Sequence, residues 1–428
     1  MKAPTNAVGH SAKLKKRLDS HLILAWIGFT QMRPLSPKII IPTHEFYPKK
    51  GGIGVYLEEL ACSASKNYEV CVWAPHHPNL KAENVPFSIR ELNVAPNESL
   101  RSVWKTMQSL GKQMGSSEVE ASTQLWCLGE PAVIRAYMLG CMTGTIPLKA
   151  EVVLILHGSE MQRFYAKPHL RHLFQNALNR SRRIGVVSRY NADWLTSHFE
   201  VAEEKLRITS GALPTSFASH IRNCSGSVEK DDPFSHSSHH DRGKTPCRLL
   251  TVGRLHPRKG QHAVMEAIKR LPLKIQKQIE YRVVGPVVHR RYYQQCHRLA
   301  SKTSAQVVFQ HDVETREALQ ATYKWADVFL MTSLPWKKSI EGFGLVYLEA
   351  GAMGLPSIAH DTGGVSEAVL HGETGLLVSP DDRDALSDAI ETMIQYPLYR
   401  AELGDNARKR ALGTSWDHVV RELFEGLA

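Results

Sequence analysis

The sequence contains no long apolar run and no paired cysteines. No stretch reaches the roughly 20 consecutive apolar residues that a membrane-spanning helix needs, so we expect no span. The cysteines number seven, an odd total, and none of them form a C-x-x-C pair. This spacing argues against a disulfide framework or a structural zinc site, and it predicts reduced thiols in a cytoplasmic protein.

Acidic residues are scarce in two parts of the chain. The formal net charge is +11; the first 50 residues carry nine Lys or Arg against Asp19 and Glu45, and Met161–Tyr190 carries seven and no acid. Such charge favours anionic partners, namely phospholipid headgroups, nucleotide diphosphates or nucleic acid. A nucleic-acid binder would need aromatic stacking platforms or a helix that reads bases, and the sequence offers neither, so we expect no nucleic-acid partner.

Length and composition indicate more than one domain. A chain of 428 residues with 43% hydrophobic and 22% charged residues is globular and too long for a single core. Residues 1–35 are predicted to be a basic tail, with a short signal peptide as the alternative. Residues 223–245 are polar and predict a linker or insertion. For His236, His239 and His240 in this segment we favour a flexible polar loop, and a metal site is the alternative.

Short apolar stretches alternate with helical patterns along most of the chain. This alternation predicts parallel sheets covered by helices on both faces. The predicted strands of the first half are Pro37–Pro42, Glu69–Ala74, Gln124–Leu128, Val152–His157 and Arg183–Val187, and those of the second half begin at Arg248 and continue with Tyr281–Val284, Val307–Gln310 and Asp327–Met331.

The stretch Glu341–Pro356, EGFGLVYLEAGAMGLP, carries the strongest functional signal. Two glycines precede an apolar run that predicts a buried helix, whose free amides and positive dipole end suit a phosphate. Glu341 lies before this helix, and Glu349 lies about two turns further on by the 3.6-residue repeat. A strand-to-helix turn with two solvated glutamates is the alternative interpretation.

This stretch resembles the E-x7-E motif of the retaining family 4 glycosyltransferases (glycosyl transferases group 1). Other segments resemble the family in the same order: the loop Gly51-Gly52-Ile53-Gly54, the strand end His157-Gly158, the Val-Ser element with Ser188, the pair Gly253-Arg254 with Lys259-Gly260, and a closing pattern at Gly363, Gly364, Glu367, Gly372 and Gly375. The chain departs from the family at His311, where a glycine normally stands beside the nucleotide base. That departure leaves the identity of the base open.

The resemblance implies an α/β protein of the GT-B fold, in which two Rossmann-like domains face each other across a cleft. We place a basic tail at 1–35, an N-terminal acceptor domain at 36–215, a linker at 216–246 and a C-terminal nucleotide-sugar domain at 247–405. Residues 406–428, with Trp416, are expected to form a helix that returns to the N-terminal domain.

The resemblance also implies transfer of a sugar from a nucleoside diphosphate sugar to an acceptor hydroxyl with retention at the anomeric carbon. Arg254 and Lys259 are expected to neutralise the diphosphate, Glu341 to orient the sugar hydroxyls, Glu349 to hold the ribose, and His157 to contact the donor sugar. The implied catalytic residues are thus Glu341, His157, Arg254 and Lys259. The implied donor-binding residues are Gly51, Gly52, Gly54, Gly253, Gly342, Phe343, Gly344, Leu345 and Glu349.

The resemblance implies no metal ion and no cofactor beyond the donor itself. The expected partners are the nucleotide sugar, a glycan or lipid-linked acceptor and an anionic membrane surface, met by a cytoplasmic protein at the inner face of the membrane. Two alternatives remain open: a nucleotide-sugar 2-epimerase of the same fold, and a non-catalytic sugar-nucleotide-binding homologue.

Overall fold

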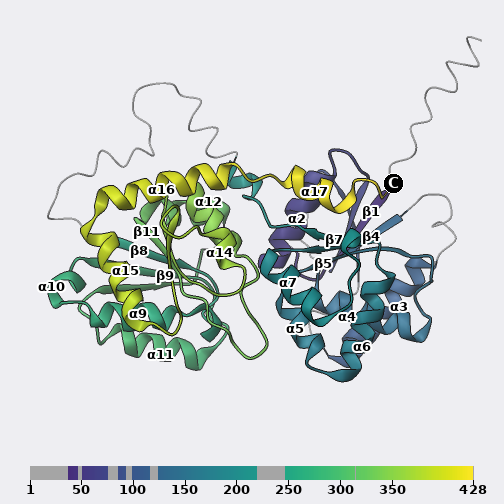
Figure 1. Cartoon of the computed structure of the whole chain (residues 1–428), viewed down its shortest axis with the longest axis horizontal. Coiled ribbons are helices and arrows are strands. Elements are labelled where there is room, and N and C mark those ends of the chain that lie inside the picture. Colours follow the sequence, from purple (N-terminus) through teal and green to yellow (C-terminus); the bar gives the residue numbers. More distant parts are fainter. Residues whose placement is uncertain are drawn as a thin grey trace, which may run out of the picture.

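The computed structural model describes residues 37–46, 51–75, 85–92, 99–115, 124–218, 246–313 and 315–427. Within these ranges the chain forms two α/β domains that lie side by side (Figure 1). The predicted basic tail, Lys49 and Lys50, and most of the predicted linker with its three histidines lie outside the described residues.

The first domain is built on a seven-stranded sheet in the order β3-β2-β1-β4-β5-β6-β7, with every pair parallel. Helix α2 and the C-terminal helix α17 (Trp416–Phe424) cover one face, and α3, α4 and α6 cover the other. The strands are β1 Lys38–Pro42, β2 Val70–Ala74, β3 Ser88–Glu91, β4 Gln124–Leu128, β5 Glu151–Leu156, β6 Arg183–Val186 and β7 Leu206–Ile208; the helices are α2 Gly52–Ala64, α3 Leu100–Met114, α4 Pro131–Thr143, α5 Ser159–Tyr165, α6 Pro168–Arg180 and α7 Arg189–His198.

The second domain repeats this plan with a six-stranded parallel sheet in the order β10-β9-β8-β11-β12-β13. Its strands are β8 Cys247–Val252, β9 Ile279–Val284, β10 Gln306–Gln310, β11 Val328–Met331, β12 Ser357–His360 and β13 Gly375–Val378; its helices are α9 Gln261–Arg270, α10 Leu273–Gln276, α11 Arg290–Ala300, α12 Arg316–Trp325, α13 Leu345–Ala352, α14 Val365–Ala368, α15 Arg383–Gln395 and α16 Pro397–Leu412. Strand order reverses beside β1 and beside β8, and sheets of this kind bind ligands at that point.

The strands predicted from apolar stretches are present, each within two residues of its predicted bounds. The sequence did not predict β12 and β13 of the second domain, nor β3 and β7 of the first, whose residues are mostly exposed or only partly buried. Short edge strands of this kind carry little apolar alternation, so the pattern that identifies buried strands is missing.

The last part of the chain crosses between the domains. Helix α16 packs on α13 of the second domain and ends at Leu412, with Gly413 as its C-cap. Helix α17 (Trp416–Phe424) then packs on α2 of the first domain. The indole N–H of Trp416 donates to the Leu213 carbonyl at 3.1 Å. The predicted boundary between residues 405 and 406 falls inside α16, so the return to the first domain begins after Leu412.

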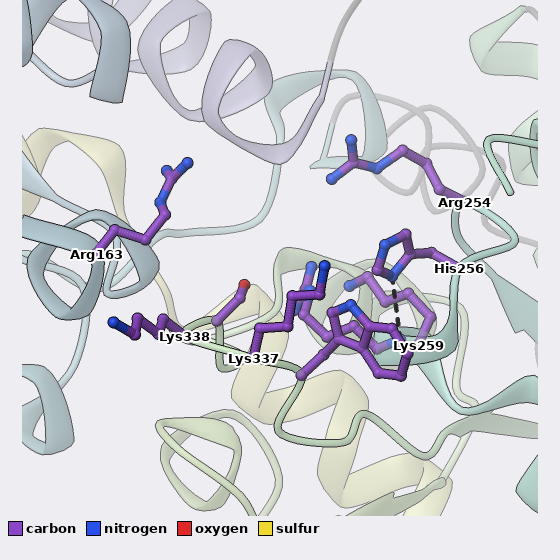
Figure 2. Close-up of a pocket in the computed structure, with 9 residues that line it drawn as sticks. Arg163, Arg254, His256, Lys259, Lys337 and Lys338 are labelled. Carbon is purple, nitrogen blue, oxygen red and sulfur yellow. Dashed lines mark hydrogen bonds between the residues drawn. The ribbon is translucent and has the colours of Figure 1, made fainter. Parts of the chain in front are cut away.

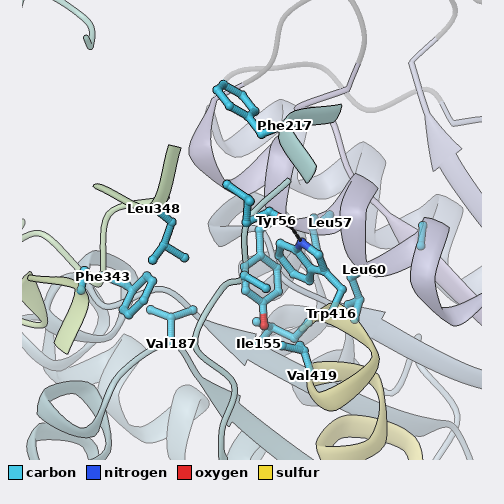
Figure 3. Close-up of a cluster of buried hydrophobic side chains, with 14 of the residues drawn as sticks. Tyr56, Leu57, Leu60, Ile155, Val187, Phe217, Phe343, Leu348, Trp416 and Val419 are labelled. Atoms are coloured by element: carbon cyan, nitrogen blue, oxygen red, sulfur yellow. Dashed lines mark hydrogen bonds between the residues drawn. The ribbon is translucent and has the colours of Figure 1, made fainter. Parts of the chain in front are cut away.

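One hydrophobic cluster continues from the first domain into the second (Figure 3). Tyr56 of α2 packs edge to face on Trp416, with ring centroids 5.0 Å apart, while Val187 lies near Phe343 and Leu348 of the second domain. The Glu367 carboxylate accepts from two backbone amides at the start of α7, those of Arg189 at 2.8 Å and Tyr190 at 3.0 Å. Apolar packing and a helix cap therefore hold the two domains together.

Candidate functional site

The loop after β8 carries the predicted cations into the space between the domains. Gly253 ends the strand with its amide donating to the Val284 carbonyl, and a 3-10 turn, η5 Pro257–Lys259, follows. Gly260 has φ of 69°, and a Cβ at this position would lie 1.7 Å from the Thr332 carbonyl oxygen. Only glycine fits here, and its turn fixes the direction of the Lys259 side chain.

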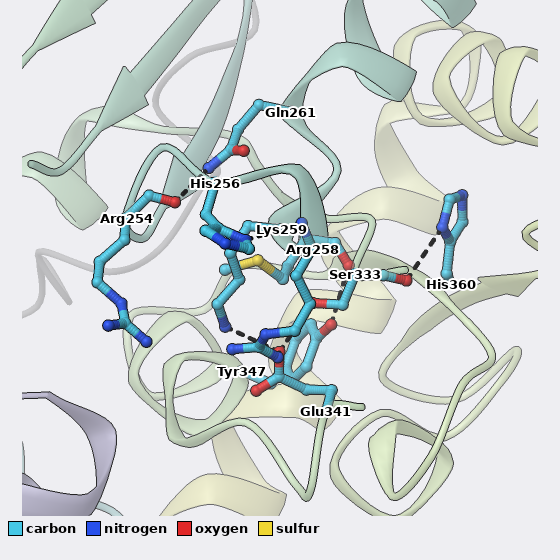
Figure 4. A network of polar contacts seen from close by, with 10 residues as sticks. Arg254, His256, Arg258, Lys259, Gln261, Ser333, Glu341, Tyr347 and His360 are labelled. Atoms are coloured by element: carbon cyan, nitrogen blue, oxygen red, sulfur yellow. Dashed lines mark hydrogen bonds and ion pairs between the residues drawn. The ribbon is translucent and has the colours of Figure 1, made fainter. Parts of the chain in front are cut away.

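The Glu341 carboxylate is the centre of a buried polar network (Figure 4). Its Oε2 accepts from Lys259 Nζ, Arg258 Nη1 and Ser333 Oγ, each at 2.8 Å. Burial opposes ionisation, but the Lys259 ammonium and the Arg258 guanidinium outweigh it and hold the pKa of Glu341 well below its usual range. The carboxylate is therefore ionised and ties both cations in place.

Basic side chains from both domains line a pocket of about 490 Å³ beside this network (Figure 2). Six of the nine lining residues are Lys or Arg, and no acid is among them; the nine are Arg163, Arg254, His256, Arg258, Lys259, Trp336, Lys337, Lys338 and Ser339. Arg163 comes from α5 of the first domain and the others from the second. Such a concentration of one charge predicts an anionic ligand.

Of the two predicted cations, Lys259 is paired with Glu341, whereas the Arg254 side chain is exposed and lines the pocket without an ion pair among the described residues. The Arg254 carbonyl accepts from Gln261 at 3.0 Å, which anchors its backbone. Sequence reasoning missed Arg258, although it stands in the same basic stretch, because only the geometry of η5 tells which of the cations faces Glu341.

The second glutamate of the motif lies within α13. Glu349 is 8% exposed and accepts from the Tyr323 hydroxyl at 2.7 Å. Burial raises its pKa to about 7, against an ordinary value of 4.5. In this structure the carboxyl group meets a tyrosine of α12, and its predicted contact with a ribose stays a prediction.

Residues between the two glutamates divide into backbone and packing roles. A Cβ at Gly342 would lie 2.1 Å from the His157 carbonyl oxygen, so the two domains touch here. The Phe343 side chain is 8% exposed and belongs to the shared hydrophobic cluster, and Leu345 packs against Gly211. Their side chains therefore face the core, which leaves the backbone around Gly344 as the part that could meet a donor.

On the first domain, His157 stands at the end of β5 with its ring edge to face with Tyr56, centroids 5.1 Å apart. Burial lowers the pKa of His157 to about 4, so the imidazole is neutral at physiological pH. Its buried Nε2 makes no hydrogen bond to the described residues. A buried ring nitrogen without a partner beside the Gly342 loop fits a contact with a bound ligand.

The glycine loop of the first domain holds a carboxylate of its own chain. The Gly54 amide donates to Glu45 Oε2 at 3.3 Å, and a Cβ at Gly51 would lie 2.4 Å from the same oxygen. Burial, together with the nearby Glu130 carboxylate, raises the pKa of Glu45. Gly52 has open space around it. The loop therefore presents an amide to an anion, and the sequence analysis did not predict that Glu45 would accept this hydrogen bond.

The described part of the chain contains neither a cluster of metal ligands nor a helix that could span a membrane. Among those residues, no three His, Cys, Asp or Glu side chains come together in a way that could hold a metal ion. None of the helices described is both long and apolar enough to cross a bilayer.

Two family models match the chain, one on each domain. Residues 50–217 match the model described as Glycosyltransferase Family 4, and residues 235–410 match that described as Glycosyl transferases group 1. The two predicted motifs with the strongest signal, the basic loop after β8 and the two-glutamate segment, both fall within the second match.

Curated relatives extend the likeness along most of the chain. A GDP-mannose-dependent alpha-(1-6)-phosphatidylinositol monomannoside mannosyltransferase of Mycolicibacterium smegmatis is 26% identical over 399 residues, which cover 90% of this chain and 96% of the relative. A D-inositol 3-phosphate glycosyltransferase of Pseudarthrobacter chlorophenolicus is 32% identical over 196 residues, 45% of each chain.

Solved structures share the fold. Anabaena HepE in complex with UDP and glucose superposes with a TM-score of 0.64 at 17% identity, covering 91% of this chain and 99% of that one. Sucrose-phosphate synthase from Thermosynechococcus elongatus gives a TM-score of 0.66 at 19% identity, covering 90% and 96%. At such identities the likeness speaks for the arrangement of the two domains alone.

Proposed function

The chain belongs to the family 4 glycosyltransferases of the GT-B fold, and we propose that it moves a hexose, with mannose the expected one, onto a hydroxyl of an inositol-containing acceptor. Transfer of a sugar from a nucleoside diphosphate to an acceptor hydroxyl is the activity of this family. One relative is named for its use of GDP-mannose, and both relatives are named for inositol-containing acceptors. These names support mannose as the sugar and an inositol compound as the acceptor.

One observation carries the proposal: the buried Glu341 holds Lys259 and Arg258 at the edge of a pocket that is lined with cations from both domains. When the bond between sugar and phosphate breaks, negative charge grows on the departing diphosphate. Fixed cations at that place stabilise the transition state more than the ground state, and they need no reorganisation during the reaction.

We assign the remaining roles from the same geometry. Lys259 and the exposed Arg254 contact the diphosphate, joined by backbone amides around Gly344, and His157 contacts the donor sugar as a neutral imidazole. A donor phosphate oxygen takes the proton of the acceptor hydroxyl on the face that the diphosphate leaves, which gives retention at the anomeric carbon. Glu349 is proposed to hold the ribose once it turns from Tyr323.

Because the side chains supply the positive charge, we expect the transfer to need no metal ion. Turnover that persists after treatment with a chelator supports this expectation, and a strict requirement for Mg²⁺ or Mn²⁺ contradicts it.

We also propose peripheral contact with an anionic membrane, from the basic charge of the first domain. Equal co-sedimentation with neutral and anionic vesicles would count against that contact.

The test uses the purified full chain with GDP-mannose or UDP-glucose as donor and phosphatidylinositol in mixed micelles as acceptor. Release of GDP that depends on the acceptor, with an α-linked mannosyl product by nuclear magnetic resonance, supports the proposal. Epimerised sugar formed without acceptor would instead indicate the 2-epimerase. Binding of a nucleotide sugar in calorimetry without transfer to the acceptor would favour the non-catalytic sugar-nucleotide-binding homologue.

A further inference from the structure

The pocket between the domains holds more positive charge than a donor diphosphate uses. Each phosphate of a nucleoside diphosphate sugar carries a single negative charge, whereas six Lys or Arg side chains line the pocket. Glu341 offsets part of the charge of Arg258 and Lys259, and Glu160 interacts with Arg163. Among the described residues, no carboxylate forms an ion pair with Lys337 or Lys338, and both are exposed. The surplus predicts a second anion beside the donor.

The two lysines stand at the tip of a tight turn. Trp336 and Ser339 exchange two backbone hydrogen bonds of 3.0 Å, and Lys337 between them has φ of 54°. It is the one described residue other than glycine with a positive φ. A lysine in this conformation is strained, and strain of this kind is found where a site requires it. The turn holds both ammonium groups against the pocket, although glycine or asparagine would form it at lower cost.

The turn faces a cation of the other domain. Lys337 reaches back toward Lys259, while Lys338 extends toward α5, which carries Arg163 (Figure 2). Arg163 and Lys338 thus bound the side of the pocket away from the network of Glu341, and Lys337 lies between that side and Lys259. A guanidinium and two ammonium groups together offer donors for the several oxygens of a phosphate.

We propose that Arg163, Lys337 and Lys338 form a binding site for a phosphate group of the acceptor, distinct from the cations that hold the donor diphosphate. This inference rests on the proposed function, because it takes the pocket to be the place where donor and acceptor meet. The required chemistry is a phosphate ester next to the hydroxyl that receives the sugar. Its source is either a lipid phosphodiester or a free phosphorylated polyol.

The site acts by orientation. A phosphate fixed between the two domains places the neighbouring hydroxyl against the anomeric carbon of the donor, and such positioning lowers the barrier without any contact to the reacting atoms. Phosphate-bearing acceptors should therefore bind more tightly and react faster than the same polyol without phosphate.

The experiment measures binding to enzyme saturated with GDP. The probes are myo-inositol 1-phosphate, myo-inositol, and phosphatidylcholine vesicles with and without phosphatidylinositol. The variants are the double substitution Lys337→Asn with Lys338→Gln, in which asparagine tolerates the left-handed backbone, and Arg163→Gln. Lys112→Ala on α3, an exposed cation that does not line the pocket, is the matched control.

We expect the double variant to raise the Kd of inositol 1-phosphate about tenfold or more, because charged hydrogen bonds are lost, and to leave the Kd of GDP unchanged. Arg163→Gln should act in the same direction, and the control should have no effect. Binding of the soluble phosphate identifies a free polyol phosphate as sufficient, whereas binding to phosphatidylinositol vesicles alone identifies the lipid source.

Three outcomes would overturn the proposal. The site does not exist if the wild-type enzyme binds myo-inositol and inositol 1-phosphate with equal affinity and binds vesicles equally with and without phosphatidylinositol. Variants that retain wild-type affinity for the phosphate exclude these residues. If the variants lose affinity for GDP and for inositol 1-phosphate to the same extent, the cations bind the donor and not the acceptor. Failure of the proposed function is separate, because wild-type enzyme would then bind no nucleotide and transfer no sugar.

Discussion

Replacing Glu341 with glutamine tests whether this carboxylate sets the charge of the pocket. Glutamine keeps the shape and can still accept from Ser333, but it leaves Arg258 and Lys259 without a counterion. Their side chains are 15% and 14% exposed, so little water reaches them. Breaking a buried ion pair costs about 3 to 5 kcal/mol, and this residual exposure favours the lower end, about 3 kcal/mol of unfolding free energy.

A bound nucleotide should return part of this loss. In the wild-type protein the Glu341 carboxylate competes with the proposed diphosphate for Lys259, because the ammonium group of Lys259 already pairs with Glu341. We therefore expect Glu341→Gln to bind GDP at least as tightly as the wild type. Turnover should fall, because an amide bears no charge with which to place the cations or bind the sugar hydroxyls strongly.

The assay is urea denaturation with and without saturating GDP, joined to calorimetric titration of GDP and to steady-state kinetics. The control is Glu422→Gln, which removes a carboxylate that lies 3.7 Å from Arg207 on the surface and is 35% exposed. Such a pair is worth about 0 to 1 kcal/mol, and its loss should not respond to GDP. The reasoning is refuted if GDP affinity falls together with turnover in Glu341→Gln.

Three further substitutions test other parts of the site. The folded pKa of Glu349 is about 7 against 4.5 in the unfolded chain, so the folded state retains a proton that the unfolded state has released between those values, and stability falls as pH rises through this window. Glu349→Gln should remove this slope and stabilise the protein above pH 7 by up to about 3 kcal/mol, measured by urea denaturation across pH; an unchanged slope would contradict the burial of its carboxyl group. Glu367→Ala removes the cap that joins the domains, so it should lower the free energy of unfolding by about 1 to 2 kcal/mol and increase the radius of gyration in small-angle scattering. An unchanged scattering curve would count against a role of this cap in holding the domains together. Gly260→Ala places a methyl group 1.7 Å from the Thr332 carbonyl oxygen, and it should abolish GDP binding by displacing the basic turn; retained affinity in calorimetry would show that the turn tolerates the change.

The second domain was the easier half to predict. Its strands β8, β9 and β11 are largely buried apolar runs, and its motif residues lie in two contiguous stretches, so local pattern was enough to place Lys259 after β8 and Glu341 after β11 of the same sheet. Local pattern could not tell that Arg258 also reaches Glu341, because the direction of a side chain depends on the φ of Gly260 and on the approach of β11.

Contacts between segments far apart in the sequence were out of reach. Glu349 was correctly placed in the helix that follows the two glycines, but its partner Tyr323 comes from α12, and no periodicity links the two. Likewise, Glu45 meets the glycine loop through a fold of the chain that leaves no trace in composition. Phe343 and Leu345 stand within the motif, yet the packing between domains turns their side chains into the core.

The charges of the pocket bear on how the domains stay together. Arg163 of the first domain and Lys337 and Lys338 of the second line the same pocket, and their like charges repel each other. The cap that Glu367 places on α7 and the apolar cluster around Trp416 offset this repulsion when no ligand is present. An anion bound between the domains removes the repulsion and adds attraction to both sides. Ligand binding and domain association must therefore strengthen each other. By thermodynamic linkage, the free energy by which a bound anion stabilises the contact between the domains equals the free energy by which that contact strengthens binding of the anion.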